Sequence, residues 1–129
     1  MEIEKISKEI HQNNIEKGFW EDKETKNVGE VLMLITSELA EALEAHRKGK
    51  KANVIEFKKQ MDGYNVQDSP ISFEGNFQHY IKDSFEDELA DVAIRLFDVC
   101  EGFNIDLAWH IRQKADYNKT RPFKHNKAY

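Results

Sequence analysis

The chain has 129 residues, of which 33% are charged and 40% hydrophobic, and its formal net charge is −5 at pH 7. This length suits a single soluble domain, residues 1–129, with a modest core, and is too short for two comfortable domains. The acidic balance argues against a nucleic-acid-binding protein, which normally carries a basic excess. No apolar run of about 18 residues is present, so we expect no membrane span.

The opening sequence "MEIEKISKEI" mixes acidic residues with lysines and does not resemble a signal peptide. The chain contains one cysteine, Cys100, so an intrachain disulfide is impossible. A reducing, cytoplasmic location fits this cysteine usage. We expect Cys100 to be a small core residue of a helix.

Apolar residues spaced three or four positions apart predict two helices in the first part of the chain. The first covers about residues 2–17, and Gly18 is a plausible C-terminal stop. A polar loop opened by two aromatic residues follows. Asn27, with Glu30 three residues later, is typical of a capping box at the start of the second helix, which continues to about residue 49.

Residues 50–83 differ in composition from the predicted helices on either side of them. The stretch 52–61 is a candidate short helix, whereas 62–78 is rich in turn-forming and aromatic residues and is predicted to be irregular. A third helix is predicted after Ser84 and a fourth after Asn104, ending before a polar tail that contains proline. These elements predict an all-α fold, a four-helix antiparallel bundle with a partly irregular insertion at about 50–83.

Two acidic pairs with i, i+3 spacing occupy the predicted second and third helices: Glu38 with Glu41, and Glu88 with Asp91. Residues at this spacing lie about 60° apart on one side of a helix. Glu38 falls inside the apolar stripe, and the other three border the stripes of their helices. Buried carboxylates that lie close together repel one another. Either these pairs are solvated or bridged by Lys and Arg, or they bind a divalent cation.

An all-oxygen donor set favours Mg²⁺, with Mn²⁺ as the other candidate, over iron or zinc. Partly hydrated Mg²⁺ commonly binds substrate phosphates, so cationic side chains are expected nearby. Lys114, Asn118 and Arg121 lie at i, i+4 and i+7 on one face of the predicted fourth helix. They are candidate phosphate ligands. Alternatively, the two cations only favour the C-terminal end of that helix.

The two acidic pairs and the closing sequence "KADYNKTRPFKH" resemble the MazG-type nucleoside triphosphate pyrophosphohydrolases of the all-α NTP pyrophosphatase superfamily, over about residues 11–121. The resemblance implies an α-helical, Mg²⁺-dependent enzyme that forms dimers or tetramers. Such enzymes cleave the α–β phosphoanhydride of a nucleotide to a monophosphate and pyrophosphate. By position, it implies metal ligands at Glu38, Glu41, Glu88 and Asp91 and phosphate ligands at Lys114, Asn118 and Arg121.

The resemblance also implies base contacts by Trp20 and His11, as in members that act on pyrimidine deoxynucleotides. The alternatives are a hydrophobic plug for Trp20 and a polar surface position for His11. Two features depart from the family pattern. Ser37 stands where the family often has a further glutamate, and the spacer between the acidic pairs is unusually long. A lid formed by this spacer would reshape the base pocket.

We therefore expect a Mg²⁺-dependent nucleotide pyrophosphohydrolase, with cleansing of the pyrimidine deoxynucleotide pool as a role that fits the resemblance. Glu38 or Glu41 would orient the attacking water or take its proton. One alternative is a non-catalytic helical module that binds a nucleotide or a protein partner. Another is a structural bundle whose carboxylates are only ion-paired. A homodimer or a dimer of dimers would supplement the small core.

Overall fold

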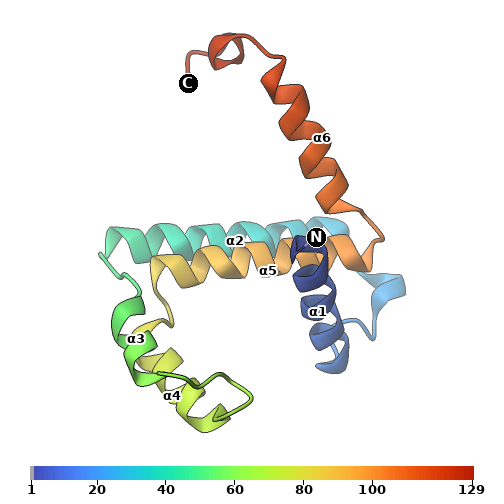
Figure 1. The fold of residues 1–129 in the computed structure, drawn as a ribbon. Helices are drawn as coiled ribbons and strands as arrows, with labels where there is room; N and C mark the ends of the chain where they lie inside the picture. The colour runs from blue at the N-terminus through green and yellow to red at the C-terminus, as the bar shows by residue number, and fades with distance from the viewer. Residues whose placement is uncertain (1) are drawn as a thin grey trace. The chain divides into compact units, whose positions relative to one another are not determined.

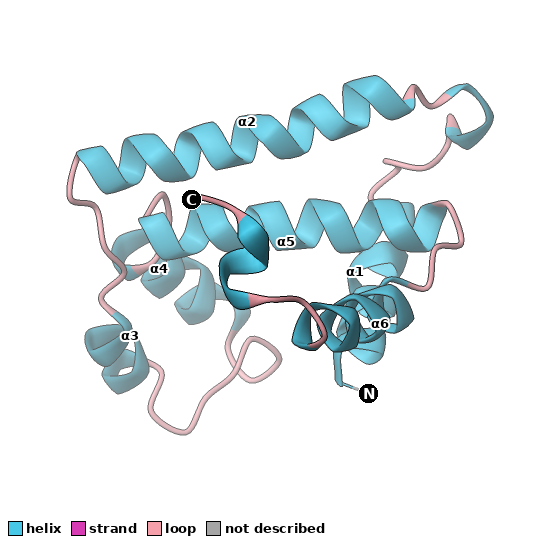
Figure 2. Ribbon diagram, turned by 90° about the horizontal axis from the view of Figure 1, so that it is seen from above, coloured by secondary structure: helices cyan, strands magenta, loops and turns pink. Residues whose placement is uncertain are grey.

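The computed structural model describes residues 2–129, and all regular elements in that range are helical (Figure 1, Figure 2). Short 3₁₀ segments cover Lys23–Thr25 and Phe123–Asn126. The predicted all-α class is confirmed. Within the described range, no helix has both the length and the apolar character needed to cross a membrane. The α-helices are α1 (Glu2–Glu16), α2 (Val28–Arg47), α3 (Val54–Gln60), α4 (Pro70–Tyr80), α5 (Phe85–Gly102) and α6 (Leu107–Lys119).

The chain forms two compact units. The central unit runs from Lys26 to Arg95 and contains α2, α3, α4 and the first part of α5. The terminal unit combines the segment up to Thr25 with the segment from Leu96 onward, and so contains α1, the end of α5 and α6. The four-helix antiparallel bundle and the single domain over residues 1–129 stay predictions.

In the central unit, α2 and the first part of α5 lie side by side and antiparallel (Figure 1). The side chain of Asn27 accepts a hydrogen bond from the backbone N–H of Glu30 at 3.0 Å, which confirms the predicted cap of α2. The Ser84 hydroxyl accepts from the N–H of Asp87 at 3.2 Å and caps α5 in the same way. The N–H of Phe85 donates to the Lys50 carbonyl at 2.9 Å, which ties the end of α2 to the start of α5.

The prediction of an irregular segment over residues 62–78 is wrong in its second half, because α4 occupies Pro70–Tyr80. Pro70 lies in the first turn of α4, where a missing N–H costs little. Phe73 and Phe77 of α4 pack against Phe57 of α3, with ring centroids 5.8 and 6.4 Å apart. This aromatic packing stabilises a helix that turn-forming composition did not indicate. The candidate short helix at 52–61 is confirmed as α3.

In the terminal unit, Gly18 follows α1 with φ of 87°, a conformation that glycine adopts without strain.

The start predicted for the last helix needs a correction. Asp106, not Asn104, caps α6, and its carboxylate accepts a hydrogen bond from the N–H of Trp109 at 2.9 Å. Asn104 has φ of 56°, a left-handed conformation that Asn tolerates well, and lies in the turn after α5.

Gly102, the last residue of α5, lies directly against the indole of Trp20, within the terminal unit. A Cβ added at Gly102 would overlap the six-membered ring of that indole. Glycine at this position ends α5. Its further role is to let an aromatic ring approach the helix backbone closely.

Gly102→Ala is expected to destabilise the protein by about 1–3 kcal/mol, because the added methyl group forces Trp20 away from α5. Urea unfolding followed by tryptophan fluorescence and circular dichroism measures the change. Gly75→Ala is the matched control, since Gly75 lies within α4 and a Cβ there meets open space. That variant should gain roughly 0.5–1 kcal/mol. Wild-type stability in Gly102→Ala would contradict the close contact.

Candidate functional site

Three of the four predicted carboxylates lie together between α2 and the first part of α5. Carboxylate oxygens of Glu38, Glu88 and Asp91 all lie within 4.8 Å of one another. Glu38 and Glu88 are only 7% and 8% exposed, and Asp91 is half-buried. We call these three residues the acidic group. Two neighbouring helices therefore direct oxygen atoms toward a common point.

The fourth carboxylate, Glu41, lies outside the acidic group but next to one of its members. A side-chain hydrogen bond joins Glu41 to Glu88. Both residues line an open pocket of about 220 Å³, to which Lys48 and Lys50 also contribute. Glu41 is exposed, whereas Glu88 is buried. Glu41 thus remains accessible to water while touching the group.

Packing raises the pKa of two carboxyls in the acidic group. For Glu88, burial is the largest cause of the raised pKa, followed by the negative charges of Glu41 and Asp91. For Asp91, burial again raises the pKa most, and the charges of Asp87 and Glu38 add to it. A raised pKa in the folded state means that the fold disfavours the ionised form. The acidic group therefore lowers stability when its carboxyls are charged.

Arg95, on α5, pairs with the most buried member of the acidic group. Its Nε donates to Oε1 of Glu38 at 2.5 Å. The Glu38 side chain is 9% exposed and the Arg95 side chain 44%. The interpretation that the pairs are bridged by a basic residue therefore holds for Glu38. The guanidinium pairs with one of the three carboxylates, so negative charge is left over when all three are ionised.

Glu88→Gln is expected to stabilise the protein in EDTA-containing buffer at pH 7, because it removes a buried like charge. A gain of about 1 kcal/mol would raise Tm by roughly 4 °C. The raised pKa means that the wild-type penalty is absent at low pH and appears as pH rises through the folded pKa. The Tm difference measured by calorimetry should therefore shrink toward about pH 4.

Glu44→Gln is the control for that measurement, since Glu44 lies on α2, lines the same pocket and is exposed. Its ion pair with Lys48 is exposed, so little change in Tm is expected. Equal gains in the two variants would contradict a burial penalty specific to Glu88.

The predicted phosphate ligands belong to α6 and its C-terminal end, in the terminal unit. The Lys114 ammonium and the Arg121 guanidinium lie 5.0 and 5.8 Å from the centre of the Tyr117 ring. Both cations therefore contact one aromatic ring. The predicted shared helix face is wrong for Arg121, because α6 ends at Lys119 and Thr120 is its C-cap. Oδ1 of Asn118 is buried and has no hydrogen-bond partner among the described residues. The phosphate-binding role of these residues stays a prediction.

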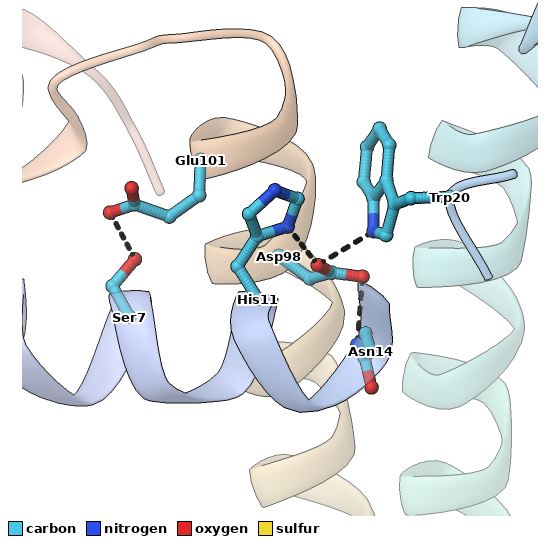
Figure 3. Close-up of polar contacts among 6 residues, drawn as sticks. All are labelled: Ser7, His11, Asn14, Trp20, Asp98 and Glu101. Carbon is cyan, nitrogen blue, oxygen red and sulfur yellow. Dashed lines mark hydrogen bonds and ion pairs between the residues drawn. The ribbon is translucent and has the colours of Figure 1, made fainter. Parts of the chain in front are cut away.

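His11 and Trp20 meet on Asp98, a residue that the sequence reasoning did not select (Figure 3). The Asp98 carboxylate is 9% exposed. It accepts hydrogen bonds from the side chains of His11, Asn14 and Trp20, at 2.6, 2.8 and 2.9 Å respectively. The ring of His11 lies edge-on to the indole, with centroids 4.9 Å apart. This network joins α1 and the loop after it to the end of α5.

The indole of Trp20 is 9% exposed, so its faces are largely covered. This geometry favours the interpretation of Trp20 as a hydrophobic plug. His11 is half-buried and bonded to Asp98, which excludes the interpretation as a simple polar surface residue. Base contacts by the two residues stay a prediction.

Arg95 and Asp98 were not selected from the sequence, although their spacing from Asp91 along α5 could have indicated them. Arg95 follows Asp91 by one helical turn, and Asp98 follows it by two.

Comparison of the chain with protein-family models, with curated proteins and with solved structures gave no match. The resemblance to the MazG-type enzymes therefore rests on the acidic pairs and the closing basic sequence. A function for the protein must be argued from the acidic group and the residues around it.

Proposed function

We propose that the protein is a metal-dependent nucleotide pyrophosphohydrolase that converts a nucleoside triphosphate to a monophosphate and pyrophosphate. The observation that carries this proposal is the convergence of Glu38, Glu88 and Asp91 from two helices within 4.8 Å. Buried carboxylates are costly unless a positive charge compensates them, and Arg95 pairs with Glu38 alone among these three. Perturbed groups of this kind occur preferentially at functional sites.

The donor set suits Mg²⁺, with Mn²⁺ as a substitute. The acidic group offers carboxylate oxygens from three residues, and hard cations take oxygen ligands. Arg95 compensates only Glu38 among these three residues, so Glu88 and Asp91 are the carboxylates that an added cation would neutralise first. When bound, the cation would neutralise phosphate charge and lower the pKa of a water molecule.

The positions of the four carboxylates suggest different roles. Glu38, Glu88 and Asp91 would hold the cation. Glu41 lies outside this set, is exposed and touches Glu88, so it is free to orient the attacking water or to take its proton. Glu38 is less suited to that role, because it is buried and paired with Arg95.

The cations of α6 would bind the phosphates and stabilise charge on the leaving pyrophosphate. Their shared contact with Tyr117 supports this role, since it brings Lys114 and Arg121 to the same aromatic ring. The amide of Asn118 would complete the set. Base contacts by Trp20 and His11, which the resemblance implies, would come from side chains already held in place by Asp98.

The direct test is pyrophosphate release from a panel of ribo- and deoxynucleoside triphosphates in the presence of Mg²⁺, with both products identified. Glu41→Gln is expected to lower kcat by about 100-fold or more, because it removes the group that positions the water. Stabilisation by Mg²⁺ alone should persist in this variant, since the acidic group is intact. Glu44→Gln, in the same pocket, should retain wild-type activity.

Other results distinguish the alternatives. Tight nucleotide binding without turnover would identify a non-catalytic binding module. Absence of turnover together with no rise in Tm on adding Mg²⁺ would identify a structural bundle with ion-paired carboxylates, because a ligand that binds the native state must stabilise it. Full activity in Glu41→Gln would refute its assigned role.

We also propose that the predicted four-helix bundle associates with itself, as a homodimer or a dimer of dimers. The support is the exposed apolar stripe of α2, where Leu32, Leu39 and Leu43 are 52%, 50% and 51% exposed. Monomeric proteins rarely expose a contiguous apolar surface of this kind. Sedimentation velocity should give a mass of two or four times 15.1 kDa. A monomer at all concentrations would contradict this proposal.

A further inference from the structure

We propose that Arg95 is a further substrate-binding residue. It stays paired with Glu38 until a divalent cation binds this carboxylate and displaces the guanidinium. In the metal-free protein the guanidinium compensates Glu38. Once a cation takes its place, the guanidinium binds a phosphate group of the incoming nucleotide. This inference rests on the proposed function and adds an order to it, with metal binding before productive phosphate binding.

The geometry makes Arg95 and the cation competitors for one carboxylate. Arg95 Nε lies 2.5 Å from Oε1 of Glu38, and Glu38 belongs to the acidic group that would hold the metal. The Glu38 side chain is 9% exposed, so it has little freedom to serve a second partner elsewhere. A cation bound by the acidic group and a guanidinium on the same carboxylate would repel each other strongly at this range.

Arginine cannot relieve this repulsion by losing a proton, because its guanidinium stays charged throughout the physiological range. The side chain must therefore move away from Glu38. Its exposure of 44% means that such movement is toward solvent and not into a packed core. The backbone of Arg95 stays one helical turn from Asp91, another member of the acidic group.

A guanidinium released at this position would lie beside the place where phosphates bind. Mg²⁺ in proteins commonly keeps substrate phosphates among its ligands. The planar fork of arginine matches two phosphate oxygens at once, which a lysine ammonium does not. The same side chain would thus weaken metal binding in the absence of substrate and strengthen substrate binding once the metal is present.

The test separates these two effects with two probes, Mg²⁺ alone and inorganic triphosphate in saturating Mg²⁺, both titrated by calorimetry. Arg95→Gln is expected to bind Mg²⁺ roughly threefold to tenfold more tightly than the wild type, because a competing positive charge is gone. The same variant should bind inorganic triphosphate about tenfold more weakly or worse. Arg95→Lys, which keeps the charge but not the fork, should bind Mg²⁺ almost as the wild type does and triphosphate with intermediate affinity.

Arg47→Gln is the matched control, since it removes the same charge from the exposed end of α2 and should change neither affinity. Circular dichroism of each variant verifies folding, and Arg95→Met replaces Arg95→Gln if the latter does not fold. Unchanged or weaker Mg²⁺ binding in the folded Arg95 variant overturns the inference, because a merely structural ion pair gives that result. Wild-type protein that binds no Mg²⁺ overturns the proposed function instead.

Discussion

Glu38, Glu88 and Asp91 bring like negative charge together between α2 and the start of α5. Glu38 and Glu88 occupy positions where apolar side chains would pack at lower cost. The fold accommodates them through Arg95, which pairs with Glu38, and through the raised pKa values of Glu88 and Asp91. Such an arrangement lowers stability in the absence of a ligand. A cation that binds the folded protein during function would offset this cost.

Asp98, in the terminal unit, is a buried carboxylate of a different kind. Asp98 is equally buried, but side chains of His11, Asn14 and Trp20 donate hydrogen bonds to it. Its polar groups are satisfied by the protein itself, so Asp98 anchors α1 and the following loop without needing a ligand. In the acidic group, by contrast, Arg95 pairs with Glu38, and burial together with neighbouring negative charge raises the pKa of Glu88 and Asp91. Of these two sites, the acidic group is the one that we propose as the cation site.

Local signals predicted most helix boundaries, because capping and termination depend on a few neighbouring residues. Asn27 and Ser84 cap α2 and α5, and Gly18 follows α1 with a positive φ, as their side chains and spacing indicate. The sequence reasoning failed where distant contacts decided the outcome. The helix α4 forms in a stretch rich in turn residues because Phe73 and Phe77 pack against Phe57 of α3.

Sequence spacing alone predicts that each acidic pair shares one side of its helix, because helical periodicity follows from local backbone geometry. The convergence of Glu38, Glu88 and Asp91, with Glu41 outside, depends on how the two helices pack. So does the contact of Arg95 with Glu38, which lies 57 positions away along the chain. Which side chains meet across two helices depends on the register in which the helices pack, and no short stretch of sequence encodes that register.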